Sequence, residues 1–358
     1  MIETLMKRIE KLLAALDSDI GGVLVTNPKN QTYLTGVDIE GAGFVFVTRS
    51  RTYIITSALY METAKNQAGD KFEVLQSGKM SEQFGQICTK HDIKKVMFEE
   101  GHVTWTQGES YKQAFDKVEL VPAGKIIDNI REYKDAEEIA SIKRAQQITD
   151  AAFTHILPFV KPDVTEVDIA VELEFFMRRM GAEAKSFDII AVSGAASSLP
   201  HGRPRNVKLQ PGFFTMDFGC KVNGYCSDMT RTVVIGKADD EMKRLYNTVL
   251  TAQMAAIDML AHGVTGQQLD KAARDVIEGS EFAGRFVHGL GHGVGLNIHE
   301  APGVHGSGTT PMAAGHVITI EPGIYLEGKY GCRIEDMAVF TEGGVEIITQ
   351  SPKELIEI

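Results

Sequence analysis

Residues 286–300, FVHGLGHGVGLNIHE, contain three histidines and four glycines. Glycine weakens the interior of a helix or strand, so this spacing indicates a backbone with close approaches and unusual turns. His288, His292 and His299 carry imidazole, which is a common metal ligand and transfers protons near neutral pH. A glycine loop whose histidines only form hydrogen bonds is the alternative. Residues 286–300 alone do not distinguish these two interpretations, so motifs elsewhere in the sequence are needed.

Length and composition indicate a globular protein with two domains. At 358 residues the chain exceeds what one hydrophobic core usually holds, and 43% hydrophobic with 24% charged residues is ordinary globular composition. The net charge of -11 argues against nucleic acid and anionic membranes as partners, because both favour clustered Lys and Arg.

Residues 1–16, MIETLMKRIEKLLAAL, place apolar residues at helical spacing with charges between them. This pattern predicts an amphipathic helix and not a signal peptide. No apolar run approaches the roughly 18 residues of a membrane span. Four cysteines without a CxxC pair, and no secretion signal, favour a reducing compartment. We therefore expect a cytoplasmic protein.

Short apolar runs alternate with helical patterns in the first third of the chain, which predicts a compact α/β domain. The predicted strands are residues 23–25, 44–47, 53–56, 74–75, 96–98 and 118–121, and the predicted helices are residues 58–68, 81–91 and 104–115. This domain has no cluster of ligand-type residues. Its single tryptophan, Trp105, is expected to be a packing residue.

Polar residues separate the two halves near residue 130, which gives domains of residues 1–130 and 131–358. Asp135 and Glu138 have the spacing of a capping box that opens a long helix. The second domain is predicted to contain helices at 136–159, 165–180, 240–261 and 265–279, a strand at 187–192, a loop with His201, and two last strands around Glu321 and Glu335.

The sharpest local pattern is a hairpin that joins residues 213–220 to residues 225–235 across an Asn-Gly turn. In the simplest register Asp217 faces Thr230. Asp228 is then the diagonal neighbour of Asp217 on the same face, at about 7–8 Å between Cα atoms. Two carboxylates at that distance can reach a shared metal site.

Core-type residues surround Asp217 on its strand, and an unpaired buried carboxylate is very costly. A metal ion is therefore favoured over the alternative of two solvated strand acids. The same register places Cys220 and Cys226 on opposite faces, which argues against a disulfide. Cys226 shares the face of the acids, so a soft metal ligand is one interpretation of it. We favour a reduced packing thiol, because oxygen-rich neighbours favour harder metals.

Four carboxylates and one imidazole form the candidate ligand set: Asp217, Asp228, His292, Glu321 and Glu335. Four negative charges balance two divalent ions, and bridging carboxylates suit ions about 3.5–4 Å apart. Oxygen ligands favour manganese, with cobalt, zinc or iron(II) as alternatives. The sequence pattern does not show whether Glu321 and Glu335 lie on the same face of the sheet. Considered separately, each glutamate is also compatible with an exposed position on a strand.

The order DFG, SDMTR, HGLGHGVG, HE, EPG and RIED resembles the creatinase/prolidase/methionine aminopeptidase family of pita-bread metallopeptidases. The resemblance runs through the second half of the chain, and the first half looks like the N-terminal domain of aminopeptidase P and prolidase. It implies an α/β N-terminal domain followed by an α+β pita-bread catalytic domain.

The resemblance also implies roles for individual residues. The five candidate ligands would hold two ions, and Glu321 would also accept the proton of a bridging water. His201, His288 and His299 would act on the substrate side, with His299 stabilising the oxyanion. Arg333 would support a metal ligand or bind the substrate chain. The implied reaction is hydrolysis of the bond between an N-terminal residue and proline, by attack of a metal-bridged hydroxide.

Two exopeptidases share these residues: an Xaa-Pro aminopeptidase, which we favour, and an Xaa-Pro dipeptidase (prolidase). A creatinase-like hydrolase or a binding protein on this scaffold would have lost ligands, and a methionine aminopeptidase would lack the N-terminal domain. The resemblance implies short proline-containing peptides as substrates and a homodimer. The remaining histidines are expected to be ordinary: His91, His102, His155, His262, His305 and His316.

Overall fold

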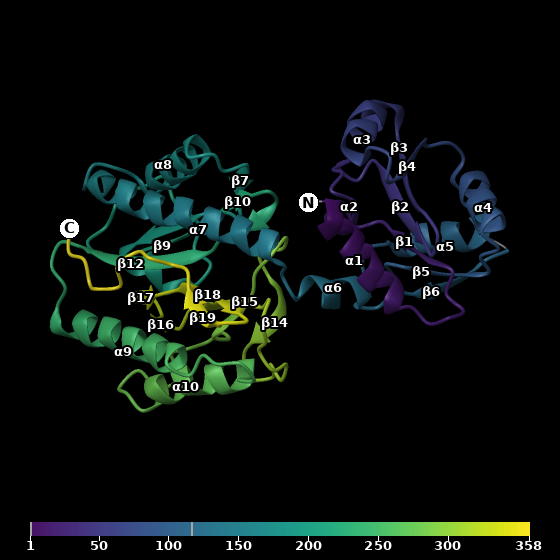
Figure 1. The fold of residues 1–358 in the computed structure, drawn as a ribbon. Helices are drawn as coiled ribbons and strands as arrows, with labels where there is room; N and C mark the ends of the chain where they lie inside the picture. The colour runs from purple at the N-terminus through teal and green to yellow at the C-terminus, as the bar shows by residue number, and fades with distance from the viewer. Residues whose placement is uncertain (1, 116) are drawn as a thin grey trace. The chain divides into compact units, whose positions relative to one another are not determined.

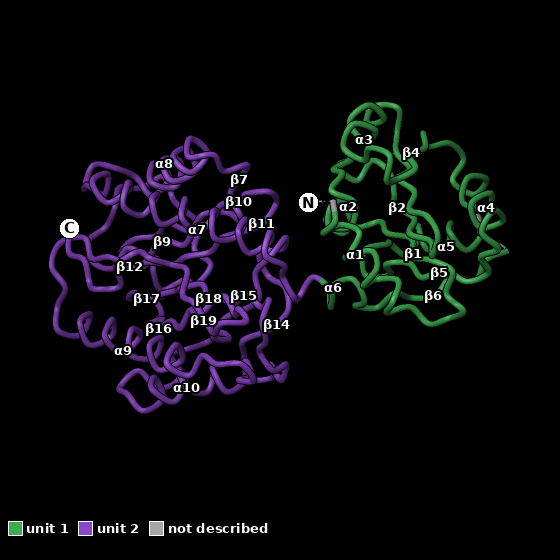
Figure 2. Tube along the Cα trace, viewed as in Figure 1, with its two compact units in different colours: residues 1–130 green, residues 131–358 purple. Residues whose placement is uncertain are grey.

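A computed structural model of the protein describes residues 2–115 and 117–358. The chain forms two compact units, residues 1–130 and residues 131–358, drawn in separate colours in Figure 2. Within the described residues, none of the helices combines the length and the apolar character that crossing a membrane requires.

The first unit is a single mixed β-sheet with helices packed against it. Its strands are β1 (Gly22–Val25), β2 (Gly43–Thr48), β3 (Thr52–Thr56), β4 (Glu73–Gln76), β5 (Lys95–Phe98) and β6 (Glu119–Pro122). Its helices are α1 (Ile2–Ala14), α2 (Pro28–Thr35), α3 (Met61–Ala68), α4 (Met80–Lys90), α5 (Trp105–Ala114) and α6 (Ile126–Arg131), the last leading out of the unit. The strand order is β4-β3-β2-β1-β5-β6, with β1 antiparallel to β2 and parallel to β5.

Each strand and helix predicted for this unit is present, and three details differ. Helix α6 was not predicted, because residues 126–135 were interpreted only as a polar boundary. Helix α2 was missed because PKNQTYLT lacks an apolar stripe, although Asn27 caps it and Pro28 opens it. The packing role predicted for Trp105 is wrong, because its side chain is 82% exposed. Trp105 is the first residue of α5 after the capping residue Thr104, and at that position it projects into solvent, with Lys112 Nζ 5.9 Å from its ring centroid.

The second unit places its strands between two helix pairs, as Figure 1 shows. The helices are α7 (Ala136–Ile156), α8 (Glu166–Arg179), α9 (Asp240–Ile257) and α10 (Gly266–Glu278). The strands are β7 (Ala184–Lys185), β8 (Ile190–Ser193), β9 (Gly212–Phe218), β10 (Cys220–Val222), β11 (Tyr225–Cys226), β12 (Met229–Ile235), β13 (Gly291–Gly293), β14 (Glu300–Val304), β15 (Val317–Ile320), β16 (Gly323–Leu326), β17 (Tyr330–Arg333), β18 (Asp336–Thr341) and β19 (Gly344–Ile347). The sheet orders are β11-β10-β7, β12-β9-β8, β14-β13-β15-β18-β19 and β16-β17.

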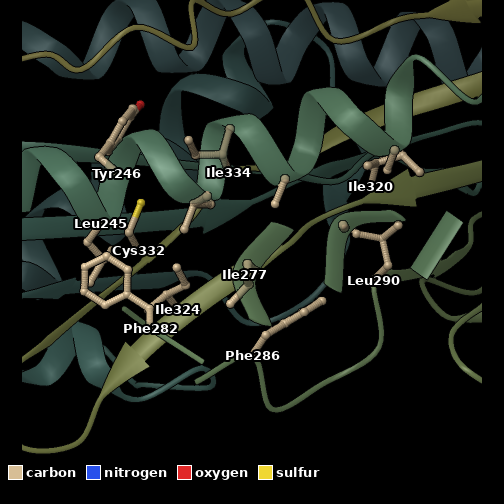
Figure 3. Packing of buried hydrophobic residues seen from close by; sticks show 14 of the residues in the cluster. Leu245, Tyr246, Ile277, Phe282, Phe286, Leu290, Ile320, Ile324, Cys332 and Ile334 are labelled. Carbon is tan, nitrogen blue, oxygen red and sulfur yellow. The ribbon is translucent and has the colours of Figure 1, made fainter. Parts of the chain in front are cut away.

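Strand β9 separates two hydrophobic cores. Phe214, Met216 and Phe218 belong to the core that packs with α7 and α8. Phe213 belongs to the other core, which packs with α9 and α10 and is shown in Figure 3. Because side chains alternate along a strand, Asp217 points to the same side as Phe213 and away from α7 and α8.

Three predicted element ends were wrong by a few residues. Helix α7 has the predicted capping box but ends at Ile156, and Pro158 lies in a 3₁₀ turn that follows. Helix α9 ends at Ile257 and not at 261, because the amides of Met259 and Leu260 bond three residues back. Strand β8 begins at Ile190, three residues later than predicted.

The hairpin has the predicted register. Asp217 pairs with Thr230, and Asn223 and Gly224 have φ values of 50° and 79°, which a primed turn requires. The strands are nevertheless interrupted between β9 and β10. A Cβ atom on Gly219 would lie 1.9 Å from the carbonyl oxygen of Ser227, so the two backbones approach too closely for any other residue.

We expect Gly219→Ala to destabilise the second unit by at least about 1–3 kcal/mol, because a backbone oxygen has to move to admit the methyl group. The free energy of unfolding, measured by urea titration, checks this. Gly306→Ala is the matched control, because no heavy atom lies within 4 Å of its added Cβ. Equal stability of the two variants would contradict the prediction.

The prediction of two last strands around Glu321 and Glu335 was wrong. Five strands, β15 to β19, occupy this region, and both glutamates lie in breaks between strands. Pro322 follows Glu321 and has no N–H for a ladder. The amide of Glu335 donates to Thr230 O, across to β12.

Candidate metal centre

All the predicted site residues line one cleft of about 950 Å³ in the second unit. They are His201, Asp217, Asp228, His288, His292, His299, Glu321, Arg333 and Glu335. They come from the hairpin, residues 286–300, the β8–β9 connection, the end of β17 and the two strand breaks. His305 also lines this cleft, although its sequence context gave no reason to single it out.

The candidate ligands converge at the floor of the cleft. One ligand atom from each of Asp228, His292 and Glu335 lies within 4.8 Å of the others. His292 Nε2 lies 3.5 Å from Asp228 Oδ2 and 3.4 Å from Glu321 Oε1. Asp217 is joined to the group through Arg333, whose Nη2 donates to Asp217 Oδ2 at 2.6 Å.

The strand breaks bring the two glutamates to the same place. Strands β15 and β18 pair as far as Ile320 and Asp336, and β16 and β17 pair from Gly323 and Arg333. Continuing this register across the break places Glu321 directly opposite Glu335. Glu335 Oε2 accepts from Thr230 Oγ1 at 2.8 Å.

His292 has the tautomer that a metal ligand needs. Its Nδ1 lies 3.1 Å from Gly293 O and donates to that carbonyl, so the lone pair on Nε2 faces the carboxylates. Burial, with a smaller contribution from His299, lowers the pKa of His292 to about 4 and keeps the ring neutral. Thr319 Oγ1 accepts from the His292 amide at 3.1 Å and donates to Glu321 Oε1 at 3.2 Å.

The candidate ligands have too little positive charge around them to balance their carboxylates. Burial, followed by repulsion from Glu335, raises the pKa of Asp228 well above its usual range. Burial likewise raises the pKa of Glu335, with repulsion from Glu321, and raises the pKa of Glu321 to about 8. Within the described parts of the chain, Asp217 Oδ1 and Glu335 Oε1 are buried and accept no hydrogen bond. Buried carboxylates that repel one another and have unused oxygens fit divalent cations.

Arg333 begins a chain of hydrogen bonds that ends at His288. Its Nη1 donates to Tyr325 Oη at 2.8 Å, and the Tyr325 hydroxyl donates to His288 Nε2 at 3.0 Å. His288 Nδ1 donates in turn to Gly289 O at 2.8 Å. Burial lowers the pKa of His288 to about 4, and Arg333 adds to this effect. The ring is therefore neutral, and both of its nitrogens bond within the protein.

His299 and His201 complete the wall of the cleft. The ring of His299 meets that of His292 edge to face, with 4.1 Å between centroids. Burial, with a contribution from His201, lowers the pKa of His299. His201 lies on the exposed loop before β9.

Glu300 fixes the segment that carries His299. Its two carboxylate oxygens accept from Arg131 Nη2 at 2.6 Å and from Lys134 Nζ at 2.8 Å. Arg131 and Lys134 are both buried.

Sequence reasoning missed several supporting side chains: Thr230, Arg231, Gln253, Thr319 and Tyr325. Thr230 and Arg231 lie within SDMTR, but only Asp228 of this motif was predicted to belong to the site. The buried Arg231 binds Asp336 Oδ1 at 2.8 Å. The predicted absence of a disulfide between Cys220 and Cys226 is confirmed, since both are free and buried.

The chain matches two protein families: metallopeptidase family M24 over residues 140–342, and the creatinase/prolidase N-terminal domain over residues 7–133. It is 40% identical to a solved Xaa-Pro dipeptidase from Bacillus anthracis, with a TM-score of 0.94 over 99% of this chain and 100% of that chain.

A solved X-Pro aminopeptidase from Thermotoga maritima MSB8 is 33% identical, with a TM-score of 0.90 over 98% of this chain and 100% of that chain. A protein of Bacillus subtilis (strain 168), named uncharacterized peptidase YqhT, is 38% identical over 98% of this chain and 99% of its own length. These similarities confirm the predicted fold class, an α/β N-terminal domain with an α+β pita-bread catalytic domain.

Proposed function

Because the chain belongs to metallopeptidase family M24, we propose that it hydrolyses the bond between an N-terminal residue and proline, as an Xaa-Pro aminopeptidase. The observation that carries the proposal is the buried group of four carboxylates and one neutral imidazole at the floor of the cleft. The names of the solved dipeptidase and aminopeptidase support the preference for proline.

Membership of a metallopeptidase family implies a divalent metal. We propose that Asp217, Asp228, His292, Glu321 and Glu335 hold two such ions, whose charges match the four carboxylates. The oxygen-rich set supports manganese, with cobalt, zinc or iron(II) as alternatives. When bound, such an ion pair makes a hydroxide available at neutral pH and polarises a carbonyl oxygen.

The chain's own residues would position the substrate and move protons. Glu321 would hold the proton released on attack. In support, Thr319 Oγ1 donates to its Oε1, and Arg333 Nε lies 3.9 Å from its Oε2. His299 would donate to the oxygen that becomes negative in the transition state. His201 would orient the peptide from the loop side. Since both nitrogens of His288 already bond within the protein, its ring would shape the pocket for proline.

The solved X-Pro aminopeptidase that is 33% identical supports an aminopeptidase. The cleft volume of about 950 Å³ lies within the roughly 300–1,000 Å³ typical of small-molecule sites and is compatible with a peptide that extends beyond proline. An Xaa-Pro dipeptidase is the second candidate, because the solved relative that is 40% identical has that name.

Comparing an Xaa-Pro-Yaa tripeptide with an Xaa-Pro dipeptide tests the proposal. With Mn²⁺ present we expect cleavage of both, with the higher kcat/KM for the tripeptide. A higher kcat/KM for the dipeptide would establish the dipeptidase instead. An Xaa-Ala-Yaa peptide is the control, and cleavage of this peptide alone would contradict the preference for proline.

We also propose that the protein is a cytoplasmic homodimer, as the sequence resemblance implies. Light scattering coupled to size exclusion gives the mass directly. A mass equal to that of one 39.2 kDa chain at micromolar concentration would contradict the dimer.

A further inference from the structure

Gln253 occupies a position on α9 where an apolar residue is expected. The buried residues of this helix follow a helical stripe, Met242, Leu245, Tyr246, Val249, Ala252, Gln253 and Ala256. Gln253 is fully buried among them. A side chain with a polar amide in this stripe needs a reason beyond packing.

The amide nitrogen of Gln253 holds two backbone carbonyls. Gln253 Nε2 donates to Ile320 O at 3.2 Å and to Ile334 O at 3.3 Å. Both isoleucine side chains belong to the buried cluster in Figure 3, with Leu245 and Tyr246 of α9. The opposite amide orientation would set an oxygen against two carbonyl oxygens, so the contacts fix Nε2 as the group that faces them.

Ile320 and Ile334 immediately precede Glu321 and Glu335. The two segments are paired on either side, but the ladder is interrupted where the glutamates stand opposite one another. Within the interruption, the Ile334 amide reaches Pro322 O at a long 3.4 Å. Like charges directly opposite each other destabilise a strand pair, so these segments need a restraint from elsewhere.

Side chains supply that restraint to three successive carbonyls. Thr232 Oγ1 donates to Arg333 O at 2.9 Å, Gln253 to Ile334 O, and Arg231 Nη1 to Glu335 O at 2.5 Å. Of these three, Gln253 is the one that also holds the segment before Glu321. It therefore ties together the backbones that carry the two glutamates.

Stability alone does not account for Gln253. Among the described residues its Oε1 is buried and has no hydrogen-bond partner, which destabilises the fold. An unbranched apolar side chain of similar length would fill the same space without a stranded oxygen, but it would leave both carbonyls without the donor that Gln253 supplies.

We propose that Gln253 is a positioning residue for the metal centre, which sets the separation of Glu321 and Glu335 by holding the carbonyls of the residues before them. This inference rests on the proposed metal-dependent function. Gln253 is not among the described residues that line the cleft, so it acts through the backbone and not on the substrate.

Two substitutions test this role by isothermal titration of the metal-free protein with Mn²⁺. Gln253→Met removes the donor and keeps the size, and Gln253→Glu replaces the donor with an oxygen. We expect both to weaken Mn²⁺ binding by about 10- to 100-fold, as losing a partner behind a metal ligand typically does. We expect the Met variant to remain folded and to lose no more stability to urea than the Gln146→Glu control, which would separate metal affinity from folding.

Gln146→Glu is the matched control, because Gln146 is also a fully buried glutamine, on α7, and within the described chain its side-chain amide has no hydrogen-bond partner. This variant is expected to lose stability and to keep its Mn²⁺ affinity within about twofold of the unsubstituted protein, since no metal ligand depends on it. Unchanged Mn²⁺ affinity in a folded Gln253→Met protein would overturn the role of Gln253 alone. Failure of the unsubstituted protein to bind any of Mn²⁺, Co²⁺, Zn²⁺ or Fe²⁺ would overturn the proposed function, and this inference with it.

Discussion

Asp228→Ala is expected to lose bound metal and peptide hydrolysis together. Asp228 lies at the centre of the cluster, with Oδ2 3.5 Å from His292 Nε2 and with Glu335 and Glu321 among the charges that raise its pKa. Its removal takes one ligand from the set and a quarter of the negative charge. Because losing a partner behind a ligand already costs about 10–100-fold in affinity, we expect losing a ligand to cost more than about 100-fold in kcat/KM.

Asp188→Ala is the matched control for this experiment. Asp188 lines the same cleft, but its side chain is 86% exposed and pairs with Lys185 at 2.9 Å. We expect this variant to keep its metal content and its turnover. Elemental analysis and peptide hydrolysis on the same samples measure both quantities. An Asp228→Ala protein that retained either its metal or its activity would count against the assignment of this residue.

Arg333→Met is expected to lower the free energy of unfolding of the metal-free protein by about 3–5 kcal/mol. The Arg333 and Asp217 side chains are only 4% and 13% exposed, and their N–O distance is 2.6 Å. Without the arginine, the carboxylate of Asp217 is left buried and uncompensated. Urea titration in the presence of EDTA measures the effect without interference from bound ions.

The chain offers a matched ion pair on its surface. Arg244 and Glu281 have the same N–O distance of 2.6 Å, but their side chains are 54% and 53% exposed. Arg244→Met should therefore cost only about 0–1 kcal/mol. Combining Arg333→Met with Asp217→Asn should recover part of the lost stability, because the second change removes the stranded charge. Equal losses for Arg333→Met and Arg244→Met would show that burial does not govern this pair.

The sequence predicted those features that depend on local chemistry. The Asn223-Gly224 turn fixed the register that pairs Asp217 with Thr230, and the box formed by Asp135 and Glu138 fixed the start of α7. Both predictions are correct because turn residues and helix caps act over only a few positions in the chain. The nine candidate site residues were predicted from motifs and from the family resemblance, and the structure brings them to one cleft.

Features that depend on distant partners were not predictable in the same way. Gln253 and Tyr325 look like ordinary helix and strand residues until the carbonyls and histidine that they bind are placed beside them. The strand break at Glu335 arises because its amide bonds to β12, which no local pattern reveals. The prediction for Trp105 was wrong for the opposite reason. Tryptophan is usually buried, but this one lies at the start of a helix and faces solvent.

Metal content together with metal-dependent hydrolysis tests the central claim most directly. We expect the metal-free protein to be inactive and to regain cleavage of an Xaa-Pro-Yaa peptide as Mn²⁺ is added, with saturation at about two ions per chain. Fewer than about one bound ion per chain, with no gain in activity on adding Mn²⁺, would contradict a two-metal peptidase.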